Sequence, residues 1–577
     1  MPGLSLNNDL TSITAQQTLP RQAVTPAPTA PAPAPVAPAG PANTPAAAPP
    51  GIVGPAGSNP VHVRLLAIND FHGQLGDSDA KVGADAIGGA ATLAGYINRE
   101  RGANPEGTVV LSVGDAFGAS PPESSLLNHE SSMAVLAGMG VNLATFGNHE
   151  WDRGYAEAMH LIAGGRRKKK NRKGKLVAAG NPWPGSPFPW VSANIIDKKT
   201  RKPIVPPYVI MEVKGVKVAF IGGVTSDLKN VTMAAGIKNL EALDPADAIN
   251  KYIPEIKAKG VKAIVAFIHE GGDVDKKTGE VMGEIVDIAK RLDPEVDVVL
   301  SAHSHKEYST RIAGKIVTQG SSYGKALAEI DLAVDPATGQ VVAGSSRIIR
   351  NAEKGITSDP MVAKMVGMFQ AAVAPKTDRV ISVLPGAISK EKSPAGETPM
   401  GTLIAEAQRY YAGADLGIMN PGGIRQPIGA GGPVTWGKLF GVQPFSNHVI
   451  KLEMTGAEVL ATLEQMFPPG GKDPIMLQLA GMRVWFDMRK PEGKRITKVI
   501  TDDGKPLNLK RRYTVAANSF IVGGGDGLTH LAKAKVLGDV GVDLDALVTY
   551  LKDGNPVPTK PIGRLNIVGG TLPDAAH

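Results

Sequence analysis

Short apolar runs that end in polar or glycine-rich turns recur between residue 61 and about residue 350 of the chain. Their length and their branched side chains are typical of buried strands. The runs are VHVRLLAIND, TVVLSVGD, VNLATFGN, VKVAFIGG, KAIVAFIHE, DVVLSAHSH and KIVTQGSS. Stretches with helical spacing lie between several of them, namely GGAATLAGYINRERG, SSMAVLAGMG and DPADAINKYIPEIKAKG. This alternation predicts an α/β sheet, with polar clusters at the carboxyl ends of its strands.

The rest of the chain predicts further parts, since 577 residues exceed one core of about 150 residues. Residues 1–60 are rich in proline and alanine and offer almost nothing to bury, which predicts a disordered tether. A first folded domain is expected over residues 61–352. A linker with a helix at PMVAKMVGMFQAAVA is expected over 353–380, and a second, α+β domain over 381–568.

Composition narrows the chemistry that is available to the protein. The chain has no cysteine, so disulfides, thiolate metal sites and a cysteine nucleophile are excluded. Any metal ion must be bound by His, Asp, Glu or Asn. No run of about 18 apolar residues is present, so no membrane span is expected, and the first residues lack the pattern of a secretory signal.

The formal net charge of +8 arises within one segment, GGRRKKKNRKGK. This segment contains eight cations between Arg166 and Lys175 and shows no apolar periodicity. We interpret residues 166–175 as a solvated surface loop inserted into the first domain. Because the remainder of the chain is neutral, nucleic acid is not an expected partner.

Polar side chains that could bind metal ions follow five of the predicted strands. Each is weak evidence alone, because a single His or Asp at a strand end more often serves a turn. The fragments, in chain order, are Asn69-Asp70-Phe71-His72-Gly73, Gly114-Asp115, Gly147-Asn148-His149-Glu150-Trp151-Asp152, His269-Glu270-Gly271-Gly272 and His303-Ser304-His305. Together they supply oxygen and nitrogen ligands suited to two divalent ions, such as zinc, manganese or magnesium.

Two divalent ions about 3.5 to 4 Å apart need at least one anionic ligand between them. Two such ions against two carboxylates leave a charge of about +2, which suits a phosphate ester better than a neutral substrate. A water held between the ions would be acidified and would attack phosphorus in line. The pattern therefore predicts phosphoryl chemistry.

The fragments NDFHG, GD, GNHEWD, HEGG and HSH resemble the calcineurin-like metallophosphoesterase superfamily, specifically its 5'-nucleotidase branch. The resemblance extends from Val61 to Val568. It implies a four-layer α/β sandwich followed by an α+β domain that binds the substrate. The chain departs from the family at Ser301-Ala302, where glycine is usual before His303.

The resemblance implies a role for each of these residues. Asp115 would bridge the two ions. Asp70, His72 and His305 would complete one metal site, and Asn148, His269 and His303 the other. His149 and Asp152 would form a catalytic pair, in which Asp152 orients the imidazole that protonates the leaving oxygen. The alternative is that His149 and Asp152 only cap the start of a helix.

Three loops of the second domain also resemble the nucleotidase branch: Asn420-Pro421-Gly422-Gly423-Ile424-Arg425, Pro444-Phe445-Ser446-Asn447, and Asn518-Ser519-Phe520 with Gly524-Gly525-Asp526-Gly527. The resemblance implies that Phe445 and Phe520 clamp the base and that Asp526 binds the ribose hydroxyls. Arg425 would bind phosphate. The remaining substrate residues implied are Asn420, Gly423, Asn447 and Gly481.

One departure concerns the substrate, because the family often has an arginine just before the glutamate that corresponds to Glu397. The chain has Ser393-Pro394-Ala395-Gly396 there. We expect hydrolysis of nucleoside 5'-monophosphates, with cyclic nucleotides or nucleotide sugars as further candidates. The alternatives are a thiohydrolase-like enzyme that acts on another oxyanion ester, and an inactive surface-binding protein. The resemblance implies a periplasmic or extracellular location, and a cytoplasmic one stays open.

Overall fold

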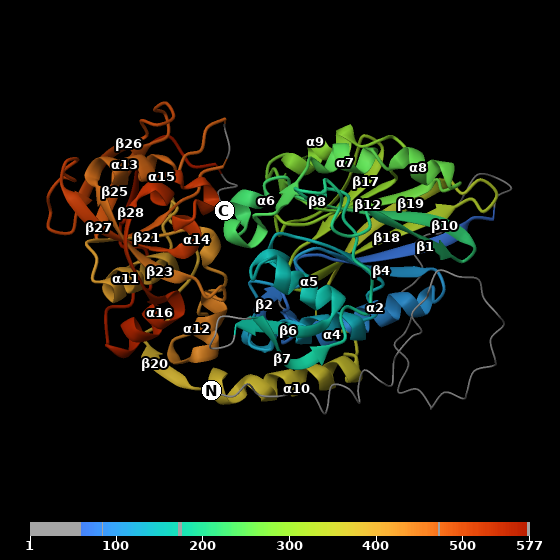
Figure 1. The fold of residues 1–577 in the computed structure, drawn as a ribbon, viewed down its shortest axis with the longest axis horizontal. Helices are drawn as coiled ribbons and strands as arrows, with labels where there is room; N and C mark the ends of the chain where they lie inside the picture. Colours follow the sequence, from blue (N-terminus) through green and yellow to red (C-terminus); the bar gives the residue numbers. More distant parts are fainter. Residues whose placement is uncertain (1–58, 83–84, 171–175, 353, 471–472, 574–577) are drawn as a thin grey trace.

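The computed structural model describes residues 59–82, 85–170, 176–352, 354–470 and 473–573. Figure 1 shows two folded parts side by side, an N-terminal part with two sheets and a C-terminal part drawn in orange and red. The helix α10 (Pro360–Thr377) connects them along one side. The predicted tether lies outside the described residues, apart from Asn59 and Pro60.

The N-terminal part contains two large sheets. The first has the order β19 (Val341–Arg350), β18 (Ala326–Val334), β1 (Val61–Ile68), β4 (Thr108–Val113) and β5 (Leu143–Thr145). The second has the order β16 (Glu307–Ile312), β17 (Lys315–Gly320), β15 (Val298–Ser301), β12 (Ala263–His269), β10 (Val216–Val224) and β9 (Tyr208–Val213). All seven predicted strands are present.

The two sheets pack face to face, because apolar side chains from both fill one buried cluster. Leu65 and Leu111 contribute from the first sheet, and Phe220 and Phe267 from the second; all four are fully buried. Side chains alternate along a strand, so neighbouring residues face the opposite side of each sheet. Each of these strands is therefore apolar on both faces, as the continuous apolar runs predicted.

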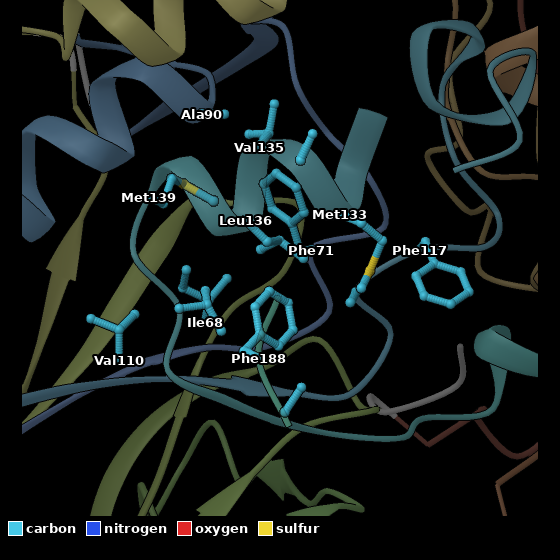
Figure 2. Packing of buried hydrophobic residues seen from close by; sticks show 14 of the residues in the cluster. Ile68, Phe71, Ala90, Val110, Phe117, Met133, Val135, Leu136, Met139 and Phe188 are labelled. Atoms are coloured by element: carbon cyan, nitrogen blue, oxygen red, sulfur yellow. The ribbon is translucent and has the colours of Figure 1, made fainter. Parts of the chain in front are cut away.

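Helices cover the outer face of each sheet. The outer face of the first sheet packs on α2 (Ala90–Ala103) and α4 (Glu130–Gly138), as Figure 2 shows for Ile68 and Val110 beside Leu136 and Met139. The second sheet is covered by α7 (Pro245–Asn250), α8 (Ile253–Ala258) and α9 (Glu284–Arg291). The order helix, sheet, sheet, helix confirms the predicted four-layer α/β sandwich.

The stretch from Asp244 to Gly260 differs from its predicted single helix, because it forms α7 and α8 with a break at Lys251 and Tyr252. Pro254 lies in the first turn of α8. A proline has no backbone N–H, and its ring clashes with the carbonyl four residues earlier, so a continuous helix is disfavoured there. The first turn of a new helix tolerates the same residue.

The described part of the basic segment forms a strand in place of the predicted loop. Residues Gly165–Lys170 form strand β6, which pairs antiparallel with β7 (Leu176–Trp183). Arg167 lies in this hairpin and forms ion pairs with Glu130 and Glu157. Backbone pairing between β6 and β7 lets a strand form here without alternating apolar side chains. The loop was predicted because that alternation is absent. Residues 171–175 lie outside the described residues.

The helix α10 packs against α2, α4 and α3 (Pro122–Ser125) of the N-terminal part and against α12 (Trp436–Val442) of the C-terminal part. It begins at Asp359, whose carboxylate accepts a hydrogen bond from the N–H of Val362, and Pro360 follows in the first turn. Such a cap contributes about 1 kcal/mol to a helix. Phe369 is buried on the side that faces the core.

The C-terminal part is built on one mixed sheet of β24 (Gln478–Ala480), β21 (Leu416–Met419), β27 (Arg512–Asn518), β23 (His448–Thr455) and β28 (Lys535–Val542). One side packs on α11 (Pro399–Ala412) and α16 (Asp543–Lys552). The other side packs on α13 (Gly456–Glu464) and the small sheet of β26 (Ile496–Thr501), β25 (Met482–Asp487) and β29 (Leu565–Gly569). This arrangement confirms an α+β second region.

No helix among the described residues is long and apolar enough to cross a membrane.

Candidate metal and nucleotide site

The central parallel strands of both sheets end at a common edge, and the candidate metal ligands follow them. Asp70, His72, Asp115 and His305 each place one ligand atom within 4.8 Å of the others. The Nε2 atoms of His72 and His305 are 3.2 Å apart. Asp70 Oδ1 lies 3.3 Å from His305 Nε2. These four residues are the bridge and the first site that the sequence predicted, and the structure brings them together.

The remaining three candidate ligands lie next to this group. His269 Nε2 is 3.2 Å from Asp115 Oδ2 and 3.8 Å from Asp70 Oδ1. Asn148 Oδ1 is 3.0 Å from His303 Nδ1. The rings of His269 and His303 have centroids 5.3 Å apart. Asp115 therefore faces His72 on one side and His269 on the other, as a bridging ligand would.

The donor set fits divalent cations. Asp70, His72 and His269 are completely buried, and Asp115 is 1% exposed. The Nε2 atom of His269 is buried and has no hydrogen-bond partner among the described residues. Burial alone would lower the pKa of His269, but Asp115 and Asp70 outweigh it and raise that pKa to about 10. Two carboxylates and several imidazoles with converging nitrogen atoms are ligands of the type that zinc, manganese and similar ions bind.

The backbone at the cluster adopts an uncommon conformation. Left-handed φ angles occur at Asp70 (48°), His72 (49°), Asp115 (48°), His303 (70°) and His305 (58°). Positive φ is uncommon for residues other than glycine and is concentrated at functional sites, where the surrounding structure maintains it. These five candidate ligands thus share a strained backbone conformation as well as side chains that can bind metal ions.

Two glycines let the strand ends approach each other. A Cβ atom at Gly147 would lie 2.1 Å from Asp115 Oδ1, and one at Gly114, whose φ is +79°, would lie 2.5 Å from His269 Nδ1. Any larger residue at either position would displace a candidate ligand. The glycines of the GD and GNHE fragments are therefore required by the packing of the cluster itself.

Glu150 is a residue of this site to which the sequence analysis gave no role. Its carboxylate accepts hydrogen bonds from the backbone N–H groups of Asp115, Ala116, Phe117 and Gly147. It is 2% exposed. Glu150 thereby ties the loop after β4 to the loop after β5, and it holds the backbone of Asp115 in place. Its position in GNHE, close to the candidate ligand Asn148 and next to His149, was the available signal.

His149 and Asp152 form the predicted pair. Nδ1 of His149 lies 3.0 Å from Asp152 Oδ2, which also accepts a hydrogen bond from the N–H of Ala119. Burial alone would lower the pKa of His149, but Asp152 and Asp115 outweigh it and raise that pKa above its usual range. The short helix η1 (His149–Trp151) starts without a side-chain cap, so the pair does not serve as a cap there.

A cavity of about 860 Å³ lies between the two folded parts. Most of the predicted substrate residues line it, and these are Asn420, Gly423, Arg425, Phe445, Asn447, Phe520 and Asp526. Asp115, Asn148, His149, Asp152, His303 and His305 line it from the N-terminal part. The cavity thus joins the candidate metal ligands to the predicted nucleoside loops.

Gly481 is the predicted substrate residue that the structure does not bring to this cavity. It lies beside β21, and a Cβ atom there would be 2.2 Å from the carbonyl oxygen of Asp415. Its φ is +77°, so the turn between β24 and β25 requires glycine for a local reason.

The polar loops of the C-terminal part are joined by hydrogen bonds. Asn420 donates from Nδ2 to Asp526 Oδ2 at 2.7 Å, and Asn518 donates from Nδ2 to Asn420 Oδ1 at 2.9 Å. Burial raises the pKa of Asp526 to about 6, although the bond from Asn420 counteracts part of the shift. The first and third loops therefore form one polar wall.

The cavity residues that the sequence analysis missed include Tyr323, Lys325 and Lys390. The ring of Tyr323 lies 5.0 Å from that of His72, and Lys325 Nζ lies 5.4 Å from the same tyrosine ring. Lys390 donates to the carbonyl of Ile424 at 2.5 Å. Burial, followed by the charges of Arg425 and Lys325, lowers the pKa of Lys390 to about 8. Tyr323 and Lys325 directly follow a predicted strand end, which was the available signal.

Comparison with known proteins agrees with this arrangement. Residues 63–307 match the calcineurin-like phosphoesterase family, and residues 375–533 match the C-terminal domain of 5'-nucleotidases. The chain is 31% identical over 543 residues to the cell wall protein Lmo0130 of Listeria monocytogenes, covering 87% of this chain and 68% of that protein. It is 32% identical over 518 residues to the endonuclease YhcR of Bacillus subtilis, covering 88% of this chain but only 41% of that protein's length.

A solved structure of similar fold is that of a 5'-nucleotidase precursor from Thermus thermophilus. It has a TM-score of 0.75 and 25% sequence identity, and the match covers 88% of this chain and 99% of that one. Both folded parts of the chain therefore have counterparts in known proteins. The chain belongs to the 5'-nucleotidase family of calcineurin-like phosphoesterases, which are hydrolases that use divalent metal ions.

Proposed function

We propose that the protein hydrolyses nucleoside 5'-monophosphates to a nucleoside and phosphate. The observation that carries the proposal is the shared cavity: it is lined by candidate metal ligands on one side and by Phe445, Phe520 and Asp526 on the other. A phosphatase without base selectivity would not need an aromatic and polar wall opposite its metal cluster. The two sides of the cavity are in contact where the ring of Phe445 lies beside that of His149, with the ring centroids 5.7 Å apart.

Two divalent ions are part of the proposal. Asp70, His72 and His305 would hold one ion, Asn148, His269 and His303 the other, and Asp115 would contact both. When bound, such ions polarise the phosphoryl oxygens and lower the pKa of water in the site. The fully buried positions of Asp70, His72 and His269 exclude bulk water from the ligand atoms.

His149 and Asp152 act on the leaving group in this proposal. Asp152 Oδ2 accepts the hydrogen bond of His149 Nδ1, which leaves Nε2 to face the cavity as a proton donor. Protonation of the 5' oxygen by Nε2 would let the nucleoside leave as a neutral alcohol. The N–H of Ala119 fixes Asp152 in turn, so the imidazole is oriented before the substrate binds.

Cations of the C-terminal part bind the phosphate. Arg425 reaches the metal cluster, where its NH2 atom is 3.3 Å from His72 Nε2, and its buried Nε has no partner among the described residues. Lys390 lies beside it through its bonds to the carbonyls of Ile424 and Arg425. Lys390 thereby supplies a positive charge in a chain that lacks the family's arginine before Glu397.

The nucleoside occupies the wall formed by the three C-terminal loops. Phe445 and Phe520 are half-buried and line the cavity, so both rings present apolar surface to a base. The carboxylate of Asp526 is positioned by Asn420 and would accept hydrogen bonds from the ribose hydroxyls. This wall distinguishes a nucleotide from a simple phosphate ester.

A panel of substrates tests the proposed function. The full-length protein, loaded with manganese or zinc, should release phosphate from AMP faster than from glycerol 2-phosphate, and it should not release thiosulfate or sulfate from their esters. Absence of phosphate release from AMP by protein that contains metal would reject the proposal. A preference for a sulfur oxyanion ester would instead support a thiohydrolase, and activity on none of the esters would support an inactive binding protein.

A second candidate activity is hydrolysis of phosphodiesters, including 2',3'-cyclic nucleotides. Glu284, Lys392 and Asp473 also line the cavity, so its lining includes charged groups that the proposed monophosphate contacts do not use. The B. subtilis relative is named an endonuclease, which is consistent with a diester in that family. A cyclic nucleotide and bis(p-nitrophenyl) phosphate, added to the same panel, distinguish diesterase from monoesterase activity.

A location outside the cytoplasm is also part of the proposal, because the L. monocytogenes relative is named a cell wall protein. Fractionation of the native host, followed by detection of the protein in each fraction, would test it.

A further inference from the structure

The aromatic side chain that meets His149 is carried by a short turn, residues 444–447, between α12 and β23. Ser446 in this turn has a left-handed backbone with φ of +56°. Phe445 and Asn447, on either side of Ser446, both line the cavity. Such a turn places two proposed substrate contacts on one strained piece of backbone, so its orientation must be fixed by neighbouring structure.

One residue, Asp543, holds both ends of this turn. It is the first residue of α16, about 100 residues further along the chain. Its backbone N–H donates to the carbonyl oxygen of Asn447 at 2.8 Å. Its carboxyl Oδ2 accepts from Nε2 of Gln443, the residue just before the turn, at 3.3 Å. Asp543 thus contacts the residue before Pro444 and the last residue of the turn.

The surroundings of Asp543 favour a neutral acid. Its side chain is 1% exposed, and no cation among the described residues forms an ion pair with it. Burial raises the pKa of Asp543 to about 8, and the charge of Asp545 adds to the shift, while the N–H of Leu544 counteracts it. On the adjacent strands β23 and β28, the charged groups His448 and Asp539 pair with each other at 2.7 Å.

A neutral Asp543 also fits the hydrogen bonds of Gln443. Gln443 is completely buried, and its Oε1 atom has no partner among the described residues. A buried amide oxygen without a donor costs about 1 to 3 kcal/mol. The two ends of a glutamine amide can exchange, so a protonated Oδ2 of Asp543 can donate to Oε1 of a turned Gln443 amide. Oδ1 meanwhile accepts from the N–H of Leu544 at 2.8 Å.

We propose that Asp543 is a positioning residue for the nucleoside: through its backbone N–H and its side-chain carboxyl it fastens both ends of the 444–447 turn and so fixes Phe445 beside His149. The inference rests on the proposed function, because it assigns the turn to base recognition. It predicts that Asp543 acts on nucleoside binding and leaves the hydrolysis of phosphate esters without a base unaffected.

Three variants of the full-length, metal-loaded protein test the role of Asp543. Asp543→Leu removes the hydrogen bonds of the side chain at similar size. In Asp543→Asn the amide oxygen can still accept from the N–H of Leu544, and the amide NH2 group can donate to Oε1 of Gln443. The variant therefore has the same hydrogen-bonding groups as a neutral carboxyl. Asp545→Asn is the matched control, since Asp545 is an exposed acid in the same helical turn. The measurements are the Kd of adenosine by calorimetry, the KM and kcat for AMP, and kcat/KM for glycerol 2-phosphate.

We expect Asp543→Leu to raise the Kd of adenosine and the KM for AMP about 10-fold, the scale of one lost base–aromatic contact. The kcat/KM for glycerol 2-phosphate should stay within about 2-fold of the wild type, because its binding uses no aromatic wall. Asp543→Asn and Asp545→Asn should both resemble the wild type near neutral pH. The inference would be overturned if Asp543→Leu lost activity equally with both esters or lost none with either. It would also be overturned if Asp543→Asn weakened adenosine binding as much as Asp543→Leu does.

A pH series keeps the inference testable if Asp543→Leu does not fold. Above a pH of about 8 the wild-type carboxyl loses its proton, and a buried carboxylate without a paired cation destabilises the packing around the turn, so adenosine should bind more weakly. Asp543→Asn should lack this decline, and an identical decline in both proteins would contradict the role. Adenosine binding requires no hydrolysis. A protein that binds adenosine as described but does not cleave AMP would therefore reject the proposed function and retain this inference.

Discussion

The phenyl ring of Phe445 lies beside the imidazole of His149, with their centroids 5.7 Å apart and their planes inclined by 28°. The two residues belong to different folded parts, since His149 follows β5 and Phe445 follows α12. The contact brings the proposed base-binding wall directly against the proposed proton donor. A nucleoside stacked on Phe445 would therefore have its 5' oxygen near the histidine.

Replacement of Phe445 by alanine should reveal this relationship. We expect the KM for AMP to rise about 10-fold, because a base loses one stacking partner worth about 1 to 3 kcal/mol. Hydrolysis of glycerol 2-phosphate should change little. Steady-state kinetics with both esters would measure the effect, and Phe467→Leu in the core of the C-terminal part controls for general loss of packing. Equal losses with both esters would show that Phe445 does not select the base.

Removal of the His149 imidazole should lower the rate of AMP hydrolysis and leave the metal content of the protein unchanged. His149→Ala is expected to reduce kcat for AMP about 10²-fold or more, because general acid catalysis typically contributes that much. Asp152→Asn should produce a smaller loss, since it only orients the imidazole through Nδ1. Metal analysis of each purified variant provides the control. A variant that loses metal along with activity would indicate a ligand role for His149 in place of an acid role.

Glu150 should affect metal affinity without touching the ions. The substitution Glu150→Gln replaces one carboxylate oxygen by an NH2 group, which cannot accept from the backbone N–H groups of Asp115 and its neighbours. Loss of such support around a metal site typically costs 10- to 100-fold in affinity, so we expect a change of about that size. Titration of the apo-protein with manganese, followed by activity, would measure it. Unchanged affinity would mean that Asp115 is positioned by other contacts.

The sequence was sufficient for the strands, because these depend on local patterns. The layer order and the set of seven candidate ligands followed from the family resemblance, and the structure brings these seven residues together. Runs such as the one ending at Asp115 are apolar over both faces, and only a buried strand accommodates that. The pairing of β6 with β7 was missed because it depends on backbone hydrogen bonds, which a search for apolar alternation does not detect.

Contacts between segments that are distant in the sequence could not be predicted from local patterns either. Tyr323 and Lys390 reach the cavity from different folded parts, and only the packing of these parts brings them together. Gly481 looked like a nucleoside contact, but its conformation satisfies a turn beside Asp415. The role of Asp543 depends on a pairing over about 100 residues with Gln443, which no local motif encodes.

Nucleoside binding should weaken in mild acid because of Asp526. Burial raises the pKa of this carboxyl to about 6, so it is ionised near neutral pH and becomes protonated as the pH falls below about 6. A protonated carboxyl accepts hydrogen bonds from the ribose hydroxyls less strongly than a carboxylate does. We expect the Kd of adenosine to increase between about pH 7 and pH 5 in the wild type. Asp526→Asn should bind weakly at both pH values, and a wild-type Kd that is constant over this range would contradict the role.

Release of phosphate from AMP as a function of added metal tests the central claim most directly. Protein stripped with a chelator and dialysed should be inactive, and manganese or zinc should restore phosphate release at a stoichiometry of about two ions per chain. Asp115→Asn, which alters the residue that the proposal assigns to both metal sites, should not be restored by the same metal. Full activity of the stripped protein, or of metal-loaded Asp115→Asn, would contradict the account.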